Sequence, residues 1–164
     1  MKVFIKNKLI SLGGSSEVLN ENQESIYKVK GKVLTFTKKK KMYDMEGNLL
    51  YTIRNKYWIA YTSKVMVYDA DGVKVATIKK HRWSIDAKYK IEDCVDEMSI
   101  EGKIWGLESK IMRNEEVAAT ITRQFTLVND AFTLEADEKD IPFMTALVIA
   151  FDNITDKREK NRKK

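Results

Sequence analysis

Residues 141–151 read Ile-Pro-Phe-Met-Thr-Ala-Leu-Val-Ile-Ala-Phe, and ten of these eleven residues are apolar when Pro142 is counted. An amphipathic surface helix would show a polar stripe every three or four residues, and this stretch has none. Asp140 just before the stretch and Pro142 in its first turn are typical of the start of a helix. At about 1.5 Å per residue the helix would be roughly 16 Å long, about half of the ~30 Å apolar core of a bilayer. The stretch therefore predicts a helix that is buried on all sides within the protein and does not cross a membrane.

The overall composition is typical of a single soluble domain. The chain has 164 residues, of which 43% are hydrophobic and 33% are charged. Residues 1–12 alternate apolar and basic side chains without an unbroken apolar core, so we expect no secretory signal. The single cysteine, Cys94, cannot form an internal disulfide, which fits a reducing compartment. We therefore expect a cytoplasmic protein.

The formal net charge of +6 is unevenly distributed along the chain. Residues 157–164 (KREKNRKK) contain six basic residues and one acidic residue, whereas residues 1–156 contain 24 basic and 23 acidic residues. We therefore expect one domain at residues 1–156 and a basic, disordered tail at residues 157–164. Proteins that recognise a nucleic-acid sequence usually carry their positive charge on the folded domain, so the near-neutral body argues against that function.

The middle of the sequence repeats. The segment YDMEG at residues 43–47 returns 25 residues later as YDADG at residues 68–72, and an Ile-x₄-Trp pattern follows each copy. Fainter correspondences are Tyr27 with Tyr51, Val29 with Ile53, Leu34 with Trp58, and residues 76–80 with residues 119–123. Self-similarity of this kind predicts one supersecondary unit that is used several times.

Each copy is predicted to be a β-hairpin. In the clearest copy, residues 64–68 lead into the turn at residues 69–72 (DADG), and residues 73–78 lead out of it. Asp and Gly suit such turns, and β-branched residues favour the strands beside them. Gly47 and Gly72 are therefore expected at positive φ. Aligning the copies gives two columns on one strand face, which we expect in the core: Tyr27, Tyr51, Ala76 and Ala119, and then Val29, Ile53, Ile78 and Ile121.

These hairpins and the buried helix together predict the fold. Further strands are expected at residues 3–5, 16–19, 34–37, 89–92, 98–101, 106–112 and 131–135. A flat sheet would cover one face of the helix, whereas a closed sheet covers every face and leaves no unpaired edge. The predicted fold is mainly β, a closed antiparallel β-barrel around the C-terminal helix. A two-layer α+β sandwich is the alternative.

Three segments carry a resemblance to a known family. They are the opening KVFIKNKLISLGG, the YDMEG and YDADG hairpins with their Ile-x₄-Trp patterns, and the late DIPFMTALVIAFDNI. Together they resemble the LURP-one-related family, which belongs with the tubby C-terminal-like proteins and the phospholipid scramblases. The resemblance covers residues 1–154 and implies about twelve strands around a central hydrophobic helix. It also implies anionic phospholipid as a ligand class and a peripheral position at the membrane.

A run of four lysines provides the candidate lipid-binding residues: Lys38, Lys39, Lys40 and Lys41. The run lies between two predicted strands. One interpretation is a solvated turn, or a strand edge protected by charge. The other is a contact for anionic headgroups, to which each nearby cation contributes about 1 kcal/mol. The three tryptophans, Trp58, Trp83 and Trp105, could either pack in the core or lie at a membrane interface. Trp58 and Trp83 recur at the same place in the repeat, which favours packing for these two.

Other candidate residues favour structural roles. The only histidine, His81, and Cys94 show no spacing that supports a nucleophilic pair, and the chain has too few His and Cys ligands for a structural zinc site. Residues 69–72 resemble the start of a calcium loop, but its twelfth position is Lys80 instead of Glu, so a turn is the better interpretation. Asp152 is expected to cap the helix or to meet backbone at the mouth of the barrel.

These observations favour a non-enzymatic binding module that contacts anionic membrane phospholipid and needs no cofactor or metal. The alternative is a structural or protein-interaction domain with no small-molecule ligand. An enzyme ranks third, because the sequence offers no set of nucleophile, base and orienting group. The sequence does not name the ligand, the protein partner or the oligomeric state.

Overall fold

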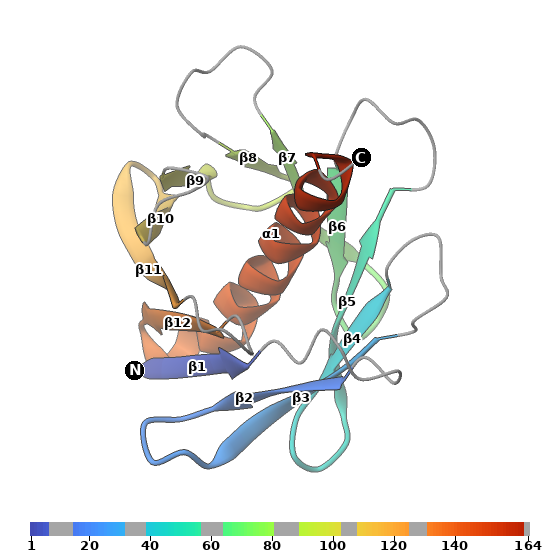
Figure 1. The fold of residues 1–164 in the computed structure, drawn as a ribbon, viewed down its shortest axis with the longest axis vertical. Coiled ribbons are helices and arrows are strands. Elements are labelled where there is room, and N and C mark those ends of the chain that lie inside the picture. The colour runs from blue at the N-terminus through green and yellow to red at the C-terminus, as the bar shows by residue number, and fades with distance from the viewer. Residues whose placement is uncertain are drawn as a thin grey trace.

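The computed structural model describes residues 1–6, 15–31, 39–56, 64–80, 89–102, 108–124 and 131–162 (Figure 1). Twelve strands precede the short 3₁₀ helix η1 (Glu138–Asp140) and the helix α1 (Ile141–Arg162). The strands are β1 (Lys2–Lys6), β2 (Ser15–Leu19), β3 (Ser25–Gly31), β4 (Lys40–Tyr43), β5 (Leu49–Asn55), β6 (Lys64–Tyr68), β7 (Lys74–Lys80), β8 (Tyr89–Glu92), β9 (Met98–Gly102), β10 (Glu108–Arg113), β11 (Glu116–Gln124) and β12 (Ala131–Ala136).

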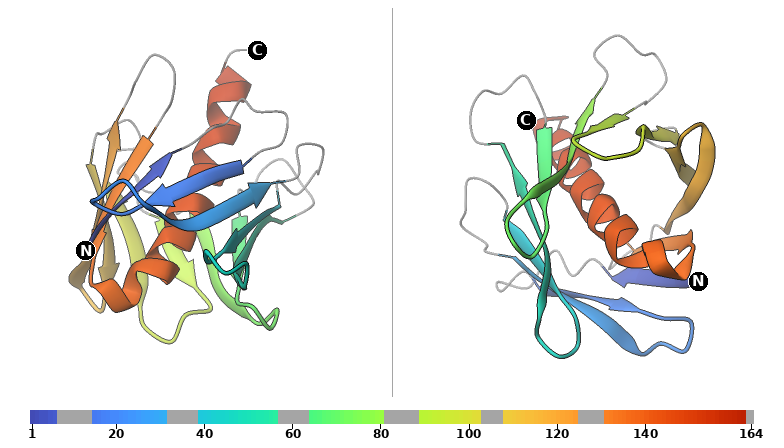
Figure 2. Two further views of the ribbon diagram at one scale, coloured as in Figure 1. Left: turned by 90° about the horizontal axis from the view of Figure 1, so that it is seen from below. Right: turned by 180° about the vertical axis from the view of Figure 1, so that it is seen from behind.

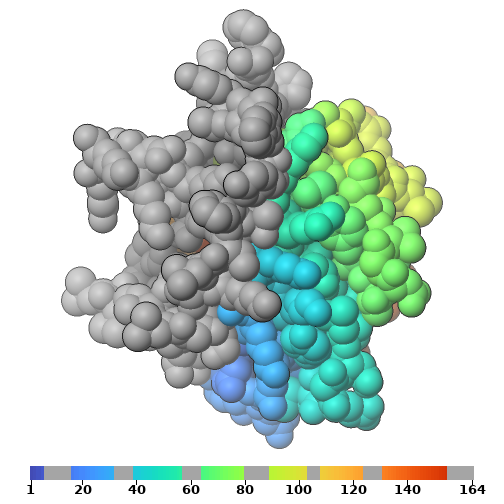
Figure 3. Space-filling view, turned by 90° about the vertical axis from the view of Figure 1, so that its right-hand side faces the viewer, coloured from blue at the N-terminus to red at the C-terminus, as the bar shows by residue number. Residues whose placement is uncertain are grey.

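The strands form one closed antiparallel barrel in which each strand pairs with its neighbours in the chain. β1 closes the barrel by pairing with β12, which places Val3 opposite Leu134 and Ile5 opposite Phe132. α1 runs through the interior and contacts β5, β6, β7 and β12 (Figure 2). In the space-filling view, β4 to β7 lie side by side as an outer wall (Figure 3). The predicted barrel is confirmed, and the alternative sandwich is not.

The core follows the alternation of the strands. The column of Val29, Ile53, Ile78 and Ile121 is buried, as are Ala76 and Ala119. The two tyrosines of the other column, Tyr27 and Tyr51, are half-buried and pack against the same core. The inner face meets α1, whose residues 144–154 are all buried. The predicted core columns are therefore confirmed.

Three hairpins share one turn geometry, which explains the repeat. In each turn the backbone N–H of the fifth residue donates to the side-chain oxygen of the first residue: Glu24 to Asn20 (2.9 Å), Asn48 to Asp44 (2.8 Å) and Val73 to Asp69 (2.8 Å). The fourth residue has positive φ in each turn: Gln23 (64°), Gly47 (93°) and Gly72 (84°). The glycine prediction is confirmed. The copy at residues 20–24 was missed because Gln stands in the place of the glycine.

The helix begins at Ile141 as predicted and continues well past Phe151. It extends to Arg162, so it includes most of the basic tail, where the sequence predicted disorder. No glycine or proline follows Pro142, and Lys, Arg and Glu are good helix formers, so nothing local ends the helix earlier. The boundary of the domain at residue 156 stays a prediction.

The structure corrects one element and leaves others outside its description. Lys40 and Lys41 begin β4, so the interpretation of the whole lysine run as a turn was wrong. Met42 is buried on the inner face of the barrel, and the strand that carries it begins two residues earlier, at Lys40. The predicted strand at residues 34–37 lies outside the described residues, as do Lys38, His81 and the three tryptophans.

Candidate functional site

The two ends of the barrel differ in charge. Because neighbouring strands are antiparallel, the connections alternate between the ends. We call one end the acidic end; it comprises residues 20–24, 44–48, 69–73, 93–97, 114–115 and 137–140. These residues include thirteen carboxylates and one lysine. α1 begins at this end.

We call the opposite end the basic end. There β1, β3, β5, β7, β9 and β11 end, and the C-terminal part of α1 emerges (Figure 2). The segments that join strand ends here are residues 7–14, 32–39, 56–63, 81–88, 103–107 and 125–130. They include eight basic and two acidic residues, and most of them lie outside the described residues. Residues 157–162, the last part of α1, add four basic residues and one acidic residue to the same end.

The lysine run reaches the basic end but does not act as one patch. Lys40 shares the inner face of β4 with Met42, and its Nζ lies 3.4 Å from Oδ2 of Asp152 on α1. The Lys40 side chain is 19% exposed and that of Asp152 is 6% exposed. Lys41 lies on the opposite, outer face of the strand, and Lys39 precedes it at the rim. The structure therefore separates Lys40 from Lys39 and Lys41.

The cavity that the described residues form beside Lys40 is too small for a headgroup. The cavity that Lys40 and Asp152 line has a volume of about 10 Å³, which suits at most one water molecule. Asn55 at the end of β5 and Asn153 on α1 are also buried in the barrel. Asp152 lies in the interior of α1, which continues to Arg162, so the predicted capping role was wrong. Its backbone contact stays a prediction, and the structure shows the Lys40 ammonium beside it.

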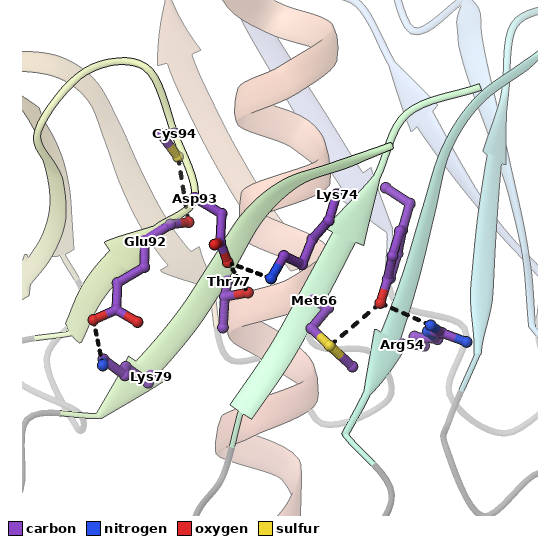
Figure 4. A network of polar contacts seen from close by, with 9 residues as sticks. Arg54, Met66, Lys74, Thr77, Lys79, Glu92, Asp93 and Cys94 are labelled. Carbon is purple, nitrogen blue, oxygen red and sulfur yellow. Dashed lines mark hydrogen bonds and ion pairs between the residues drawn. The ribbon is translucent and has the colours of Figure 1, made fainter. Parts of the chain in front are cut away.

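The outer wall between the two ends carries polar networks (Figure 4). The Thr77 hydroxyl donates to Asp93 Oδ2 at 2.6 Å, and the Lys74 ammonium lies 3.1 Å from the same oxygen. The hydrogen bond from Thr77, followed by that from Lys74, lowers the pKa of Asp93. On β5, Arg54 donates to the Tyr68 hydroxyl at 2.7 Å and lies over its ring. These groups satisfy one another, so we interpret them as structural.

A hollow of about 410 Å³ opens at the acidic end beside the start of α1. Its lining is mostly apolar and includes Tyr51, Val75, Val95, Met98 and Phe143. The rings of Tyr51 and Phe143 lie with their centroids 6.0 Å apart. Burial, with Asp69 nearby, raises the pKa of Tyr51, so its hydroxyl stays protonated at neutral pH.

Two further residues that line this hollow, Cys94 and Arg113, offer no reactive group at neutral pH. Burial raises the pKa of the Cys94 thiol to about 11, so the reactive thiolate is scarce at neutral pH. The Arg113 guanidinium donates to Asp140 Oδ2 at 2.9 Å, and this bond raises its pKa. Cys94 lies at the acidic end, whereas β7 ends with Lys80 at the basic end, directly before His81. The predicted absence of a His–Cys pair stays a prediction, because His81 lies outside the described residues.

Residues 69–72 form a hairpin turn, as the sequence favoured over a calcium loop. Among the described residues, no group of three His, Cys, Asp or Glu side chains could hold a metal ion. Within the same residues, no helix is both long and apolar enough to cross a membrane.

Sequence reasoning missed the ion pair and the hollow for different reasons. Lys40 stands two positions before Met42, so strand alternation would have placed both on the inner face. The contact of Arg113 with Asp140 joins residues 27 positions apart and leaves no local pattern. The hollow combines residues from seven separate elements or connections, so it appears only in the folded chain.

Comparison with known proteins gives one match. The model of the family described as LURP-one-related matches residues 1–152. No curated protein and no solved structure matches the chain at a significant level.

Proposed function

The chain belongs to the LURP-one-related family, and from this premise we propose that it is a non-enzymatic binding module of the cytoplasm that places its basic end against anionic membrane phospholipid. The contact is peripheral, and it is made by the rim of the barrel together with the basic C-terminal segment. Neither a cofactor nor a metal takes part.

The observation that carries this proposal is the difference in charge, read from the sequence, between the segments that connect the strands at the two ends of the barrel. The connecting segments at the acidic end have one basic and thirteen acidic residues, and those at the basic end have eight basic and two acidic residues. A negatively charged surface attracts one end of such a molecule and repels the other, which orients the molecule before contact. Each cation that reaches the surface contributes about 1 kcal/mol at low salt.

The structure also changes which lysines we assign to the contact. Lys40 faces inward toward Asp152, so its charge is already compensated within the barrel. Lys39 and Lys41 stay candidates, because they stand at the rim and on the outer face of β4. Lys38 remains a candidate by sequence alone.

Vesicle co-sedimentation at physiological salt tests the proposal, with neutral vesicles and vesicles containing anionic lipid. The proteins are the full chain, the truncation to residues 1–156, and the double variant Lys39→Ser/Lys41→Ser. A matched control is Lys28→Ser/Lys139→Ser, which removes two exposed lysines outside the basic end. We expect binding to anionic vesicles that survives the truncation, prefers one headgroup and weakens in the first double variant only.

Two results would overturn the proposal. Loss of all binding after truncation would reduce the contact to generic attraction by the tail, which is salt-sensitive and shows no headgroup preference. Equal weakening in both double variants would mean that net charge matters and position does not.

A second candidate is a protein-interaction domain, and a different surface favours it. That surface lies at the acidic end, where the exposed Val95 lines a mostly apolar hollow.

A further inference from the structure

Exposed apolar side chains gather at the acidic end. Among the described residues, five large apolar side chains are exposed, and all of them belong to this end or to the first residues beside it. They are Met1, Met45, Val73, Val95 and Val117. Three come from three different hairpin turns, so the grouping is a property of the folded barrel and not of one segment.

The turns themselves do not require these residues. Their geometry rests on the side chains of Asp44 and Asp69 and on the positive φ of Gly47 and Gly72. Apolar residues add nothing to such turns and expose surface to water. Val95 is the extreme case, because its side chain is fully exposed at the edge of the hollow.

The hollow offers a place where an apolar side chain can be buried. Its volume of about 410 Å³ lies within the range of ligand pockets. A second hollow of about 400 Å³ shares Met98 with the first. Its lining adds Met112, Ser99, the cation of Lys90 and the carboxylates of Glu97, Glu101 and Glu115, so acidic groups outnumber basic groups there by three to one. The β8–β9 connection contributes Val95 to the first hollow and Glu97 to the second.

The charge around the hollows selects for a basic occupant. The main cation of the first hollow, Arg113, is already held by Asp140 at 2.9 Å and lies 3.5 Å from Asp96. Its charge is therefore compensated within the protein. The remaining carboxylates of the acidic end favour a partner that brings positive charge.

We propose that the acidic end is a docking surface for a basic amphipathic segment of another protein. An apolar side chain of that segment enters the hollow beside Val95 and Phe143, and its lysines or arginines face the surrounding carboxylates. Recognition by apolar anchors within a charged rim is a common mode of binding for amphipathic helices.

Other occupants fit less well. Residues 157–164 (KREKNRKK) are basic but contain no apolar side chain for the hollow. They also leave the barrel at its opposite end, so they cannot reach this surface within the same molecule. An anionic membrane is repelled by the excess of carboxylates here.

The test uses fluorescence anisotropy with two labelled peptides. The first contains only Leu and Lys in an order that gives a helix with one apolar and one basic face, and the second replaces every Leu by Ser. The protein variants are Val95→Ser and Glu97→Lys. Their matched controls are Val117→Ser and Glu108→Lys. Val117 is an exposed valine of β11 that lies beside the acidic end and lines neither hollow, so it separates the hollow from exposed apolar surface in general. Glu108 is an exposed carboxylate at the basic end.

We expect the Leu/Lys peptide to bind at least tenfold more tightly than the Ser/Lys peptide. Val95→Ser and Glu97→Lys should each weaken its binding by about five- to tenfold, and the controls by less than twofold. Val95 is fully exposed in the free protein, so its replacement leaves folding intact.

Three results would overturn the proposal. Equal affinity for both peptides would reduce the effect to charge alone. An unchanged affinity in Val95→Ser would exclude the hollow as the binding place. Concentration-dependent self-association in sedimentation velocity that disappears in the 1–156 truncation would assign the surface to a second copy of this chain. None of these results depends on vesicle binding at the basic end, so the two proposals fail separately.

Discussion

The repeated turns at the acidic end and the ion pair at the basic end are stabilised by contacts of different range. Each repeated turn is closed by a hydrogen bond between residues four positions apart, such as Asn48 to Asp44. The ion pair joins Lys40 to Asp152, which are 112 positions apart. A turn closed by local bonds forms without the rest of the fold, whereas the Lys40 contact forms only when α1 lies inside the barrel. The turns can therefore be predicted from the sequence, and the ion pair cannot.

The helix connects the two ends, and breaking it should produce the largest effect. Leu147 lies in the middle of α1 and is completely buried. Leu147→Asp places an unpaired charge in the core, which is strongly unfavourable against a typical total stability of about 5–15 kcal/mol. We expect an insoluble or molten protein without a cooperative thermal transition by circular dichroism, and the same for a chain that ends at Asp140.

The control for this variant is Leu147→Met, which conserves volume and should cost less than about 1.5 kcal/mol. Cooperative unfolding of Leu147→Asp near the midpoint of the unmodified protein would contradict a helix that fills the barrel.

The ion pair at the basic end should produce the next largest effect. Lys40→Met removes the ammonium group that lies beside the buried Asp152 carboxylate. Asp152→Leu removes the carboxylate that lies beside the Lys40 ammonium. Loss of one partner of a buried pair costs about 3–5 kcal/mol, and the partial exposure of Lys40 places our expectation near 3 kcal/mol. Urea unfolding measures the cost. The double variant Lys40→Met/Asp152→Leu should recover most of it, because an apolar pair needs no compensation.

Additive destabilisation in the double variant would show that the two residues act independently. The same variants sharpen the functional comparison between the lysines. Lys40→Met should leave vesicle binding unchanged as long as the protein is folded, whereas Lys39→Ser/Lys41→Ser should weaken it.

The predictions that succeeded from sequence were those that depend on neighbours in the chain. Strand alternation identified the buried column from Val29 to Ile121, and turn chemistry identified the positive φ of Gly47 and Gly72. The unbroken apolar face of α1 led to a closed barrel, because only a closed sheet buries every side of a helix.

What the sequence could not give depends on contacts between distant segments. The sequence left the lysine run open between a solvated turn, a charged strand edge and a headgroup contact, because the partner that lets Lys40 face inward lies on α1, 112 positions away. The end of α1 was placed too early, since the apolar stretch marks where the helix is buried and not where it ends. The hollow at the acidic end has no local pattern at all, because its lining comes from strands, connections and α1 together.

The smallest expected effect tests the acidic end through its repeated turn. Gly47 and Gly72 have φ of 93° and 84°, and a Cβ added at either position would meet no atom within 4 Å. Backbone strain is therefore the only cost of Gly47→Val or Gly72→Val, and we expect each to lower the free energy of unfolding by about 1–3 kcal/mol. Gln23 holds the same turn position with φ of 64° and provides the matched control. Gln23→Gly relieves strain while it adds freedom to the unfolded chain, so we expect a change within about 1 kcal/mol, of either sign. Urea unfolding of the three variants measures these differences. If Gln23→Gly lost as much stability as Gly72→Val, the three turns would not be equivalent. The view that local contacts stabilise all three turns would then be wrong.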